Sequence, residues 1–192
     1  MKEVADTPRR PGRPAQISRE QIVEAVATFD NIDTITMRQL AERLEVRHGA
    51  LYRWVKSRDE LFDLISEVVV DRVLSAVELD SSGWRAQLRQ LALLIREHFL
   101  ALPGYASHLS RPHVHNTHSV DRLRRACIDV FIKGGISHQH AEQSWLIFIT
   151  SMISWLAVEE QPVTIGHVTP RFDLFLGVLL RGLPTQDSDV AA

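Results

Sequence analysis

The sequence predicts an all-α protein in which a small N-terminal helical domain precedes a larger helical domain. Apolar residues recur at helical spacing along most of the chain, and no segment alternates apolar and polar residues as a strand does. Three early segments begin with Ser or Thr followed three residues later by Gln or Glu, the capping box of a helix start. The 192 residues, 45% hydrophobic and 24% charged, have the composition of a soluble globular protein of one or two domains.

Three short helices are expected near the N-terminus. The first follows the capping box at residues 18–21, and the second follows the box at residues 36–39. The third occupies the segment from Arg47 to Val55, where Leu51 and Val55 face inward. The residues expected on its outer side are His48, Gly49, Arg53 and Trp54.

Longer helices are expected in the rest of the chain. A third capping box, at residues 57–60, opens a helix that runs to about Glu78. Further helices are expected over residues 84–99, 105–110, 117–133, 137–160 and 170–183. The chain then divides into four parts: an arm rich in Pro and Arg (1–17), a three-helix domain (18–62), a larger helical domain (63–185) and a tail (186–192).

Three features favour a cytoplasmic protein that has no membrane partner. The longest nearly unbroken apolar stretch, Trp145 to Val158, has 14 residues, whereas a membrane span needs ~20. The N-terminus lacks the apolar core of a signal peptide. The single cysteine, Cys127, forms no internal disulfide and fits a reducing compartment.

Charge is unevenly distributed along the chain. The net charge is −2, yet residues 1–58 hold 11 Lys and Arg against 8 Asp and Glu, while the remainder holds 11 against 16. Between Arg38 and Arg58 there are six basic residues and two acidic ones. Such a patch suits a phosphate backbone, although a solvated helix face has the same composition.

The second and third helices have the proportions of a helix-turn-helix motif. Two short helices are joined by a tight turn, and the second presents polar and aromatic residues after a basic start. Helix pairs are common in all-α proteins, so this spacing alone leaves DNA binding and plain helical packing both open.

A longer pattern surrounds this motif. The segment 35–65 contains Leu40-Ala41, Val46, Leu51-Tyr52 and the run Trp54-Val55-Lys56-Ser57-Arg58. It resembles the DNA-binding head of TetR-family transcriptional repressors, and the last run is similar to the tetracycline-repressor branch. Gly83-Trp84, residues 107–112, residues 135–137 and residues 172–183 extend the resemblance over residues 18–183.

The resemblance implies a set of residues that contact double-stranded DNA. Arg38 would reach a guanine edge, Thr36 and Lys56 would hold phosphates, and Arg58 would clamp the backbone. The arginines of the arm would enter a minor groove, although a solvated tail is the alternative. Tyr52 either packs inward or reaches phosphate. The full set is Arg10, Arg13, Thr36, Arg38, His48, Gly49, Ala50, Tyr52, Arg53, Trp54, Lys56 and Arg58.

Two residues depart from the family pattern. Glu45 stands in the turn where the family commonly has glycine, and a non-glycine residue with positive φ costs ~1 kcal/mol. Arg47 replaces the serine that often caps the recognition helix, so the start of that helix is expected to be frayed until phosphate binds.

The larger domain is expected to form a homodimer and to bind an effector. In the family the last two long helices of two subunits form a four-helix bundle, here residues 137–160 and 170–183. Two-fold symmetry then requires a palindromic operator with half-sites ~34 Å apart. The implied pocket suits a small hydrophobic or aromatic effector, although core packing explains the same residues. They are Leu91, Ile95, His108, Trp145, Ile149 and Met152.

The identity of the effector stays open. His108 aligns with a histidine that binds a drug-chelated magnesium ion in the tetracycline branch. Other polar contacts of that branch are replaced by Leu74, Leu91 and Ile95, so tetracycline itself is not expected.

Two other classes of protein are alternatives to a ligand-responsive repressor. The first is a histidine-metal hydrolase or metal sensor that uses His108, His113, His115 and His118. The second is a helical adaptor that dimerises through the apolar stretch. Neither explains the basic run from Arg38 to Arg58, so the expected protein is a regulator, not an enzyme, with no cofactor and no resident metal.

Overall fold

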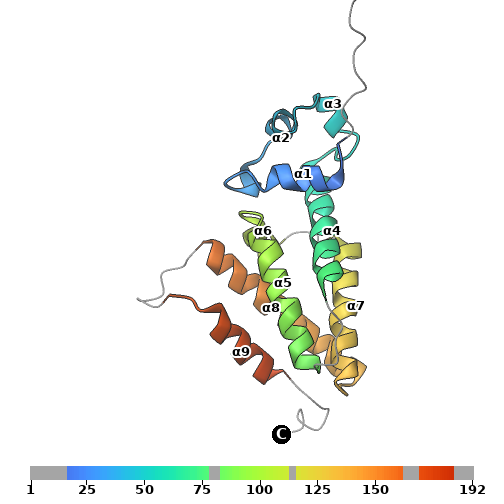
Figure 1. Cartoon of the computed structure of the whole chain (residues 1–192), viewed down its shortest axis with the longest axis vertical. Coiled ribbons are helices and arrows are strands. Elements are labelled where there is room, and N and C mark those ends of the chain that lie inside the picture. The colour runs from blue at the N-terminus through green and yellow to red at the C-terminus, as the bar shows by residue number, and fades with distance from the viewer. Residues whose placement is uncertain (1–16, 78–82, 113–115, 162–168, 184–192) are drawn as a thin grey trace, which may run out of the picture.

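A computed structural model describes residues 17–77, 83–112, 116–161 and 169–183, and all regular secondary structure within them is helical (Figure 1). The predicted all-α class is therefore confirmed. The elements are α1 (Arg19–Val26), a 3₁₀ turn η1 (Ile32–Thr34), α2 (Met37–Arg43), α3 (His48–Leu51), α4 (Arg58–Ala76), α5 (Trp84–Leu100), α6 (Tyr105–Leu109), α7 (Thr117–Lys133), α8 (His138–Glu160) and α9 (Phe172–Gly182).

The first two capping boxes form as predicted. The hydroxyl of Ser18 accepts the N–H of Gln21, and the Gln21 side chain accepts the N–H of Ser18 at 2.9 Å. Thr36 and Gln39 make the same reciprocal pair at the start of α2. At α4 the hydroxyl of Ser57 accepts the N–H of Glu60, but the Glu60 carboxylate bonds the N–H of the preceding residue, Lys56. The third capping box is therefore only half formed, since the Glu60 side chain bonds the amide of Lys56 and not that of the N-cap residue Ser57.

Three segments differ from the sequence expectation. The 3₁₀ turn η1 is not predicted, because Asp30, Asn31 and Asp33 have the pattern of a simple break. Helix α3 ends at Leu51 instead of continuing to Val55, since the amide of Trp54 bonds the Leu51 carbonyl three residues back and tightens the chain into a turn. Helix α9 begins at Phe172, two residues after Pro170.

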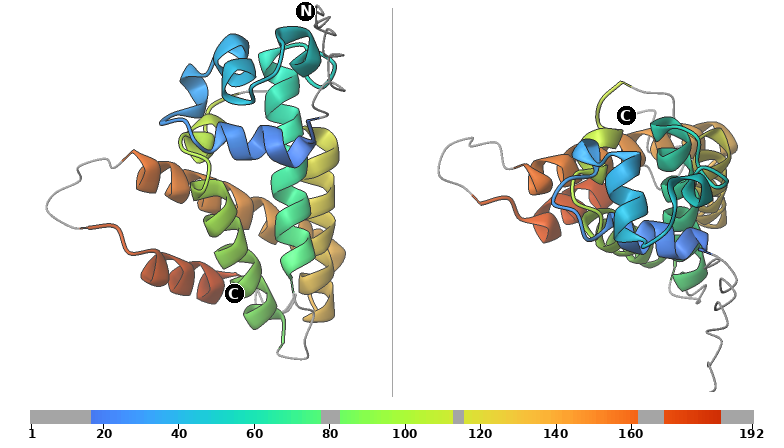
Figure 2. Two further views of the ribbon diagram at one scale, coloured as in Figure 1. Left: turned by 45° about the horizontal axis from the view of Figure 1, so that its top comes forward. Right: turned by 90° about the horizontal axis from the view of Figure 1, so that it is seen from above.

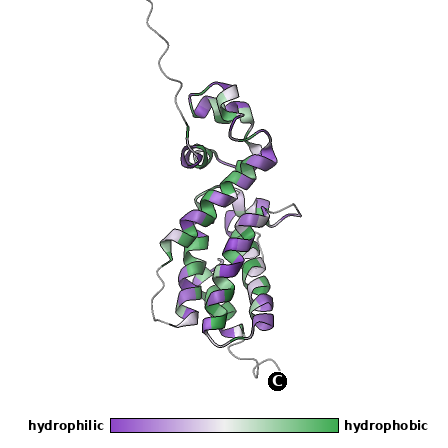
Figure 3. Cartoon of the chain, turned by 90° about the vertical axis from the view of Figure 1, so that its right-hand side faces the viewer, coloured by the Kyte–Doolittle hydropathy of each residue, from purple (hydrophilic) through white to green (hydrophobic). Residues whose placement is uncertain are grey.

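The molecule has an elongated shape with two parts. Helices α1 to α3 form a head at one end, α5 to α9 form a body, and α4 runs from the head down into the body (Figures 1 and 2). The head encloses fully buried side chains from each of its helices, including Ile22, Leu40 and Leu51, and α4 contributes Ile65. Hydrophobic residues line the inner sides of the body helices (Figure 3).

Helix α8 is the longest element, with 23 residues, and it packs against α5, α6 and α7. Among the described residues it is the one helix long and apolar enough to cross a membrane, a test that core helices of soluble proteins also pass. A third of its apolar window is buried within the chain. Helix α9 lies beside its C-terminal half, where the rings of Trp155 and Phe175 stack with centroids 4.4 Å apart (Figure 2). Much of the apolar surface of α8 is therefore left without cover by the part of the chain that the structure describes.

Candidate functional site

The turn between α2 and α3 sets the direction of the exposed helix. Glu45 has φ of 54°, the left-handed conformation that the missing glycine implies. The amide of Val46 bonds the carbonyl of Ala41 at 3.0 Å, and the amide of Glu45 bonds that of Glu42 at 3.1 Å. These two bonds form a Schellman motif, so the helix-turn-helix geometry is kept although its C′ residue is not glycine.

Helix α3 presents a basic and aromatic surface that is anchored from below. Leu51 and Val55 are fully buried in the head. On the opposite side Tyr52 is 38% exposed and Trp54 is 40% exposed, and the rings of His48 and Tyr52 lie 4.3 Å apart. Tyr52 therefore faces outward. We call His48, Gly49, Tyr52, Arg53 and Trp54 the α3 face.

The α3 face is open to a large partner. A Cβ built on Gly49 would meet no atom within 4 Å, so space is free in front of the helix. Ala50 is half-buried at its edge. Arg47, at the N-cap, makes no side-chain cap bond. The sequence prediction omits Arg47 from the site, although its place in the basic run was a signal that could have added it, and the structure shows it exposed.

Charges around this face are mostly unpaired. Within the described ranges the side chains of Arg47, Arg53 and Lys56 form no ion pair. The Arg38 side chain, 85% exposed, donates to Glu42 at 2.9 Å across one helical turn. An exposed pair of this kind is weak, so a stronger acceptor competes easily for the guanidinium.

Two predicted DNA contacts have structural partners within the chain. The Thr36 hydroxyl serves the capping box of α2. The Arg58 guanidinium donates to the carbonyls of Ile32 and Ile35, both at 3.1 Å, and lies over the Phe62 ring. The guanidinium therefore joins the start of α4 to the head, and its contact with the DNA backbone stays a prediction. Arg10 and Arg13 lie outside the described residues.

The head contacts the body at a polar junction that the sequence did not predict. The amide of Ile32 in η1 donates to the carbonyl of Pro103 at 2.8 Å. Gly104, with φ of +88°, lies so close that an added Cβ would be 2.6 Å from Oδ1 of Asn31. The Asp33 carboxylate contacts Arg58, Arg111 and the His108 ring. The junction thus joins η1, α4 and α6.

The predicted pocket residues fall into two groups. Leu91, Ile95, Trp145 and Met152 are buried and Ile149 is half-buried, all within the core of the body. His108 is instead part of the junction: its ring stacks on Phe62 with centroids 3.6 Å apart, and its Nδ1 lies 3.2 Å from Asp33.

A cavity of about 190 Å³ opens at the end of the body opposite the head, between α4, α5 and α7. Of the six predicted residues Leu91 alone lines it. The other five do not line it. The sequence could not predict this difference, because packed core residues and residues of a cavity wall have the same apolar spacing. Its lining consists of Leu74, Val77, Gln87, Leu91, Ala126, Asp129, Val130 and Lys133.

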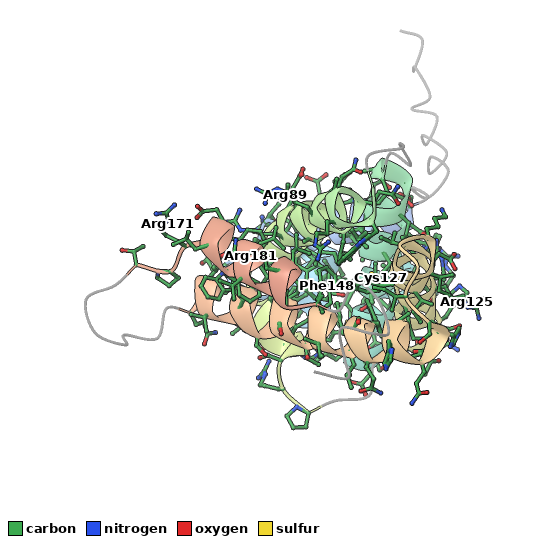
Figure 4. The ribbon with its side chains drawn as sticks, turned by 90° about the horizontal axis from the view of Figure 1, so that it is seen from below. Arg89, Arg125, Cys127, Phe148, Arg171 and Arg181 are labelled. Carbon is green, nitrogen blue, oxygen red and sulfur yellow. The ribbon has the colours of Figure 1, made fainter. Side chains whose placement is uncertain are left out.

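The metal alternative gains no support from the described residues. His108 is in the junction, His118 is exposed on α7, and His113 and His115 lie outside the described ranges. Across those ranges no three His, Cys, Asp or Glu side chains are grouped to hold a metal ion. Cys127 is fully buried, and burial raises the pKa of its thiol, so it is not a reactive thiolate (Figure 4).

Comparison with solved structures gives the fold. No family model matches the chain. Apo ActR from Streptomyces coelicolor superposes with a TM-score of 0.66 at 21% identity, over 92% of this chain and 99% of that one. A possible TetR family regulator from Streptomyces coelicolor A3(2) gives 0.64 at 22% identity, over 91% and 92%. The chain has the TetR-family fold.

The remaining comparisons agree with this fold. A single-residue variant of TetR from Acinetobacter baumannii AYE, solved with minocycline, gives a TM-score of 0.63 at 21% identity over 91% of this chain and 95% of that one. The transcriptional repressor DrrR1 of Streptomyces coeruleorubidus is 33% identical over 92 residues, 45% of this chain. The nucleoid occlusion factor SlmA of Sodalis glossinidius is 32% identical over 92 residues, 46% of this chain.

These curated relatives are matched over part of their length. The match covers 34% of DrrR1 and 44% of SlmA. The solved structures confirm the predicted TetR-family fold with its N-terminal helix-turn-helix.

Proposed function

We propose that the chain is a homodimeric, sequence-specific DNA-binding repressor of the cytoplasm, released from its operator by a small effector. The observation that carries this proposal is the α3 face: exposed aromatic and basic side chains on the second helix of a helix-turn-helix, held from below by Leu51 and Val55. Unpaired arginines next to such a helix attract a phosphate backbone.

In this proposal the head divides its contacts between bases and phosphates. Arg38 reads a guanine, and His48, Gly49, Ala50 and Arg53 lie against base edges. Arg47 and Lys56 hold phosphates together with Thr36, Tyr52 and Trp54. Arg58 fixes the start of α4 to the head, and Arg10 and Arg13 enter the minor groove.

The second subunit is proposed to cover the apolar surface of α8 and α9. Leu146 and Ile147 on α8 are exposed, as are Leu174 and Val178 on α9. Four large apolar side chains on two adjacent helices are typical of a protein interface. A two-fold dimer then presents two α3 faces to half-sites ~34 Å apart on a palindrome.

Selection of bound duplexes from a randomised DNA pool tests the proposal, with binding measured at two salt concentrations. We expect a palindrome to be enriched and the affinity to fall as salt rises, because phosphate contacts release counterions. The Arg53→Ala variant should bind the selected duplex more weakly. Arg125→Ala, which removes an exposed arginine of α7 (Figure 4), is the matched control and should bind as the wild type does.

Two outcomes would contradict the proposal. One is the absence of any enriched sequence together with weak binding at low salt. The other is an equal loss of affinity in Arg53→Ala and Arg125→Ala, since binding would then follow total charge and not the α3 face.

A further inference from the structure

We infer that the effector site is the cavity at the end of α4, α5 and α7, and that it takes a small uncharged compound with an apolar body and one hydroxyl end. This inference rests on the proposed function for its regulatory role, but the binding itself is independent of DNA. The size of the cavity, its lining and the charges at its rim each point to this ligand class.

The volume limits the size of the ligand. The cavity holds about 190 Å³, whereas pockets for drug-sized ligands have roughly 300–1,000 Å³. A dry cavity of roughly 150 Å³ in another protein accommodates benzene. A ligand slightly larger than a benzene ring therefore fills the space, and a polycyclic compound does not fit without opening the helices.

The wall of the cavity is apolar. Leu91 and Val130 are buried at its base, and Leu74, Val77 and Ala126 are half-buried around it. An aromatic or branched body would replace water at these side chains, which is favourable because it removes apolar surface from water.

The polar groups of the cavity favour a neutral end that both donates and accepts. Asp129 and Lys133 lie one helical turn apart on α7, and Gln87 faces them from α5. Within the described ranges neither Asp129 nor Lys133 forms an ion pair, so both are available to a ligand. Their charges cancel, and a hydroxyl can donate to the carboxylate while it accepts from the ammonium. A cation or an anion would satisfy one group and be repelled by the other.

The position of the cavity connects it to the head. Leu74 and Val77 belong to the last turn and the C-cap of α4, whose first turns carry Arg58 and Phe62 at the junction. A 19-residue helix is a rod of roughly 28 Å. A ligand wedged against one end therefore acts on the orientation of the head at the other.

Calorimetric titration of the full-length protein, without DNA, tests the inference with three probes of nearly equal size: benzyl alcohol, benzylamine and benzoate. We expect benzyl alcohol to bind, and the charged probes to bind at least tenfold more weakly. In the Ala126→Leu variant, which fills the cavity, binding of benzyl alcohol should be lost. Ala86→Leu makes the same change at an exposed position of α5 and should leave binding unchanged.

Asp129→Asn and Lys133→Gln keep the cavity volume and provide a second test that does not depend on the folding of Ala126→Leu. Each should weaken the binding of benzyl alcohol at least threefold, and each should reduce the discrimination against one of the two charged probes. The inference is overturned if the wild type gives no heat of binding up to about 10 mM, if Ala126→Leu binds as the wild type does, or if the three probes bind equally.

Failure here and failure of the proposed function are distinguishable. Benzyl alcohol that binds a protein for which no operator is selected supports the cavity and refutes the repressor. A selected operator together with a protein that takes none of the probes refutes the cavity and leaves the repressor standing.

Discussion

The α3 face and the exposed surface of α8 and α9 are both open to solvent, but they differ in chemistry and in support. The α3 face is basic and aromatic and stands on a four-residue helix without a side-chain cap. The other surface is apolar and belongs to a 23-residue helix and its neighbour. Electrostatic attraction acts over a distance and does not require close shape complementarity. Burial of apolar side chains, by contrast, requires a rigid surface of complementary shape. The two surfaces therefore suit a polyanion and a second copy of the chain.

The largest expected effect comes from charging the apolar surface. Leu174 and Val178 are 56% and 62% exposed one turn apart on α9, and covering the exposed part of each is worth roughly 1–2 kcal/mol. The double variant Leu174→Glu, Val178→Glu should sediment as a monomer and lose roughly 100-fold or more in affinity for a two-half-site duplex. Leu93→Glu, at an exposed leucine of α5, is the control and should remain dimeric. A double variant that stays dimeric would place the interface elsewhere.

Removing Arg38 should have a smaller and more selective effect. If its guanidinium reads a guanine, Arg38→Ala should lose about 1–3 kcal/mol of discrimination at one base pair of each half-site. Competition binding with single-base variants of the selected operator measures this. A uniform loss across all variants would mean that Arg38 contacts phosphate instead, and would move base reading entirely to the α3 face.

The strained turn provides a test within the head alone. Glu45 has φ of 54°, and relieving this conformation with glycine should stabilise the protein by up to about 1 kcal/mol in urea unfolding. Glu42→Gly, inside α2, is the matched control and should destabilise by about 0.5–1 kcal/mol. Equal effects of the two changes would mean that the turn is not strained.

The smallest expected effect concerns acid stability of the body. The hydrogen bond from Arg124 holds the pKa of Asp121 below its ordinary value, and Arg125 adds to this. Since the folded pKa is lowered, the stabilisation is present above the ordinary value of 3.8 and is lost as pH falls through the lowered value. Asp121→Asn should therefore flatten the fall of the unfolding midpoint between about pH 5 and pH 2. An unchanged slope would exclude a contribution from this pair.

Local signals in the sequence predicted most of the head. The capping boxes at Ser18 and Thr36 each depend on two residues three positions apart. They can therefore be predicted without knowing how the rest of the chain folds. The positive φ of Glu45 was expected from its position in the turn of the helix-turn-helix motif, where the family commonly has glycine. The contacts of Asp33 with His108 and Arg111 join residues more than 70 positions apart, and no local pattern encodes them.

The position of the cavity could not be predicted from local sequence patterns either. Leu91 and Ile95 share one apolar stripe of α5, yet Leu91 lines the cavity and Ile95 does not. Asp129 and Lys133 have the pattern of ordinary surface charges on an amphipathic helix. Their role in the proposed ligand site depends on the approach of α4 and α5, which the sequence of α7 does not contain.

The close approach of Asn31 to Gly104 restricts how this architecture can be recombined. A chimaera that takes its DNA specificity from one protein and its effector response from another has its natural crossover near residue 57, between the head and α4. Such a crossover separates Asn31 from Gly104, where even a methyl group would meet the Asn31 side chain at 2.6 Å. A hybrid that keeps this close packing should therefore transplant η1 with the turn before α6 as a pair.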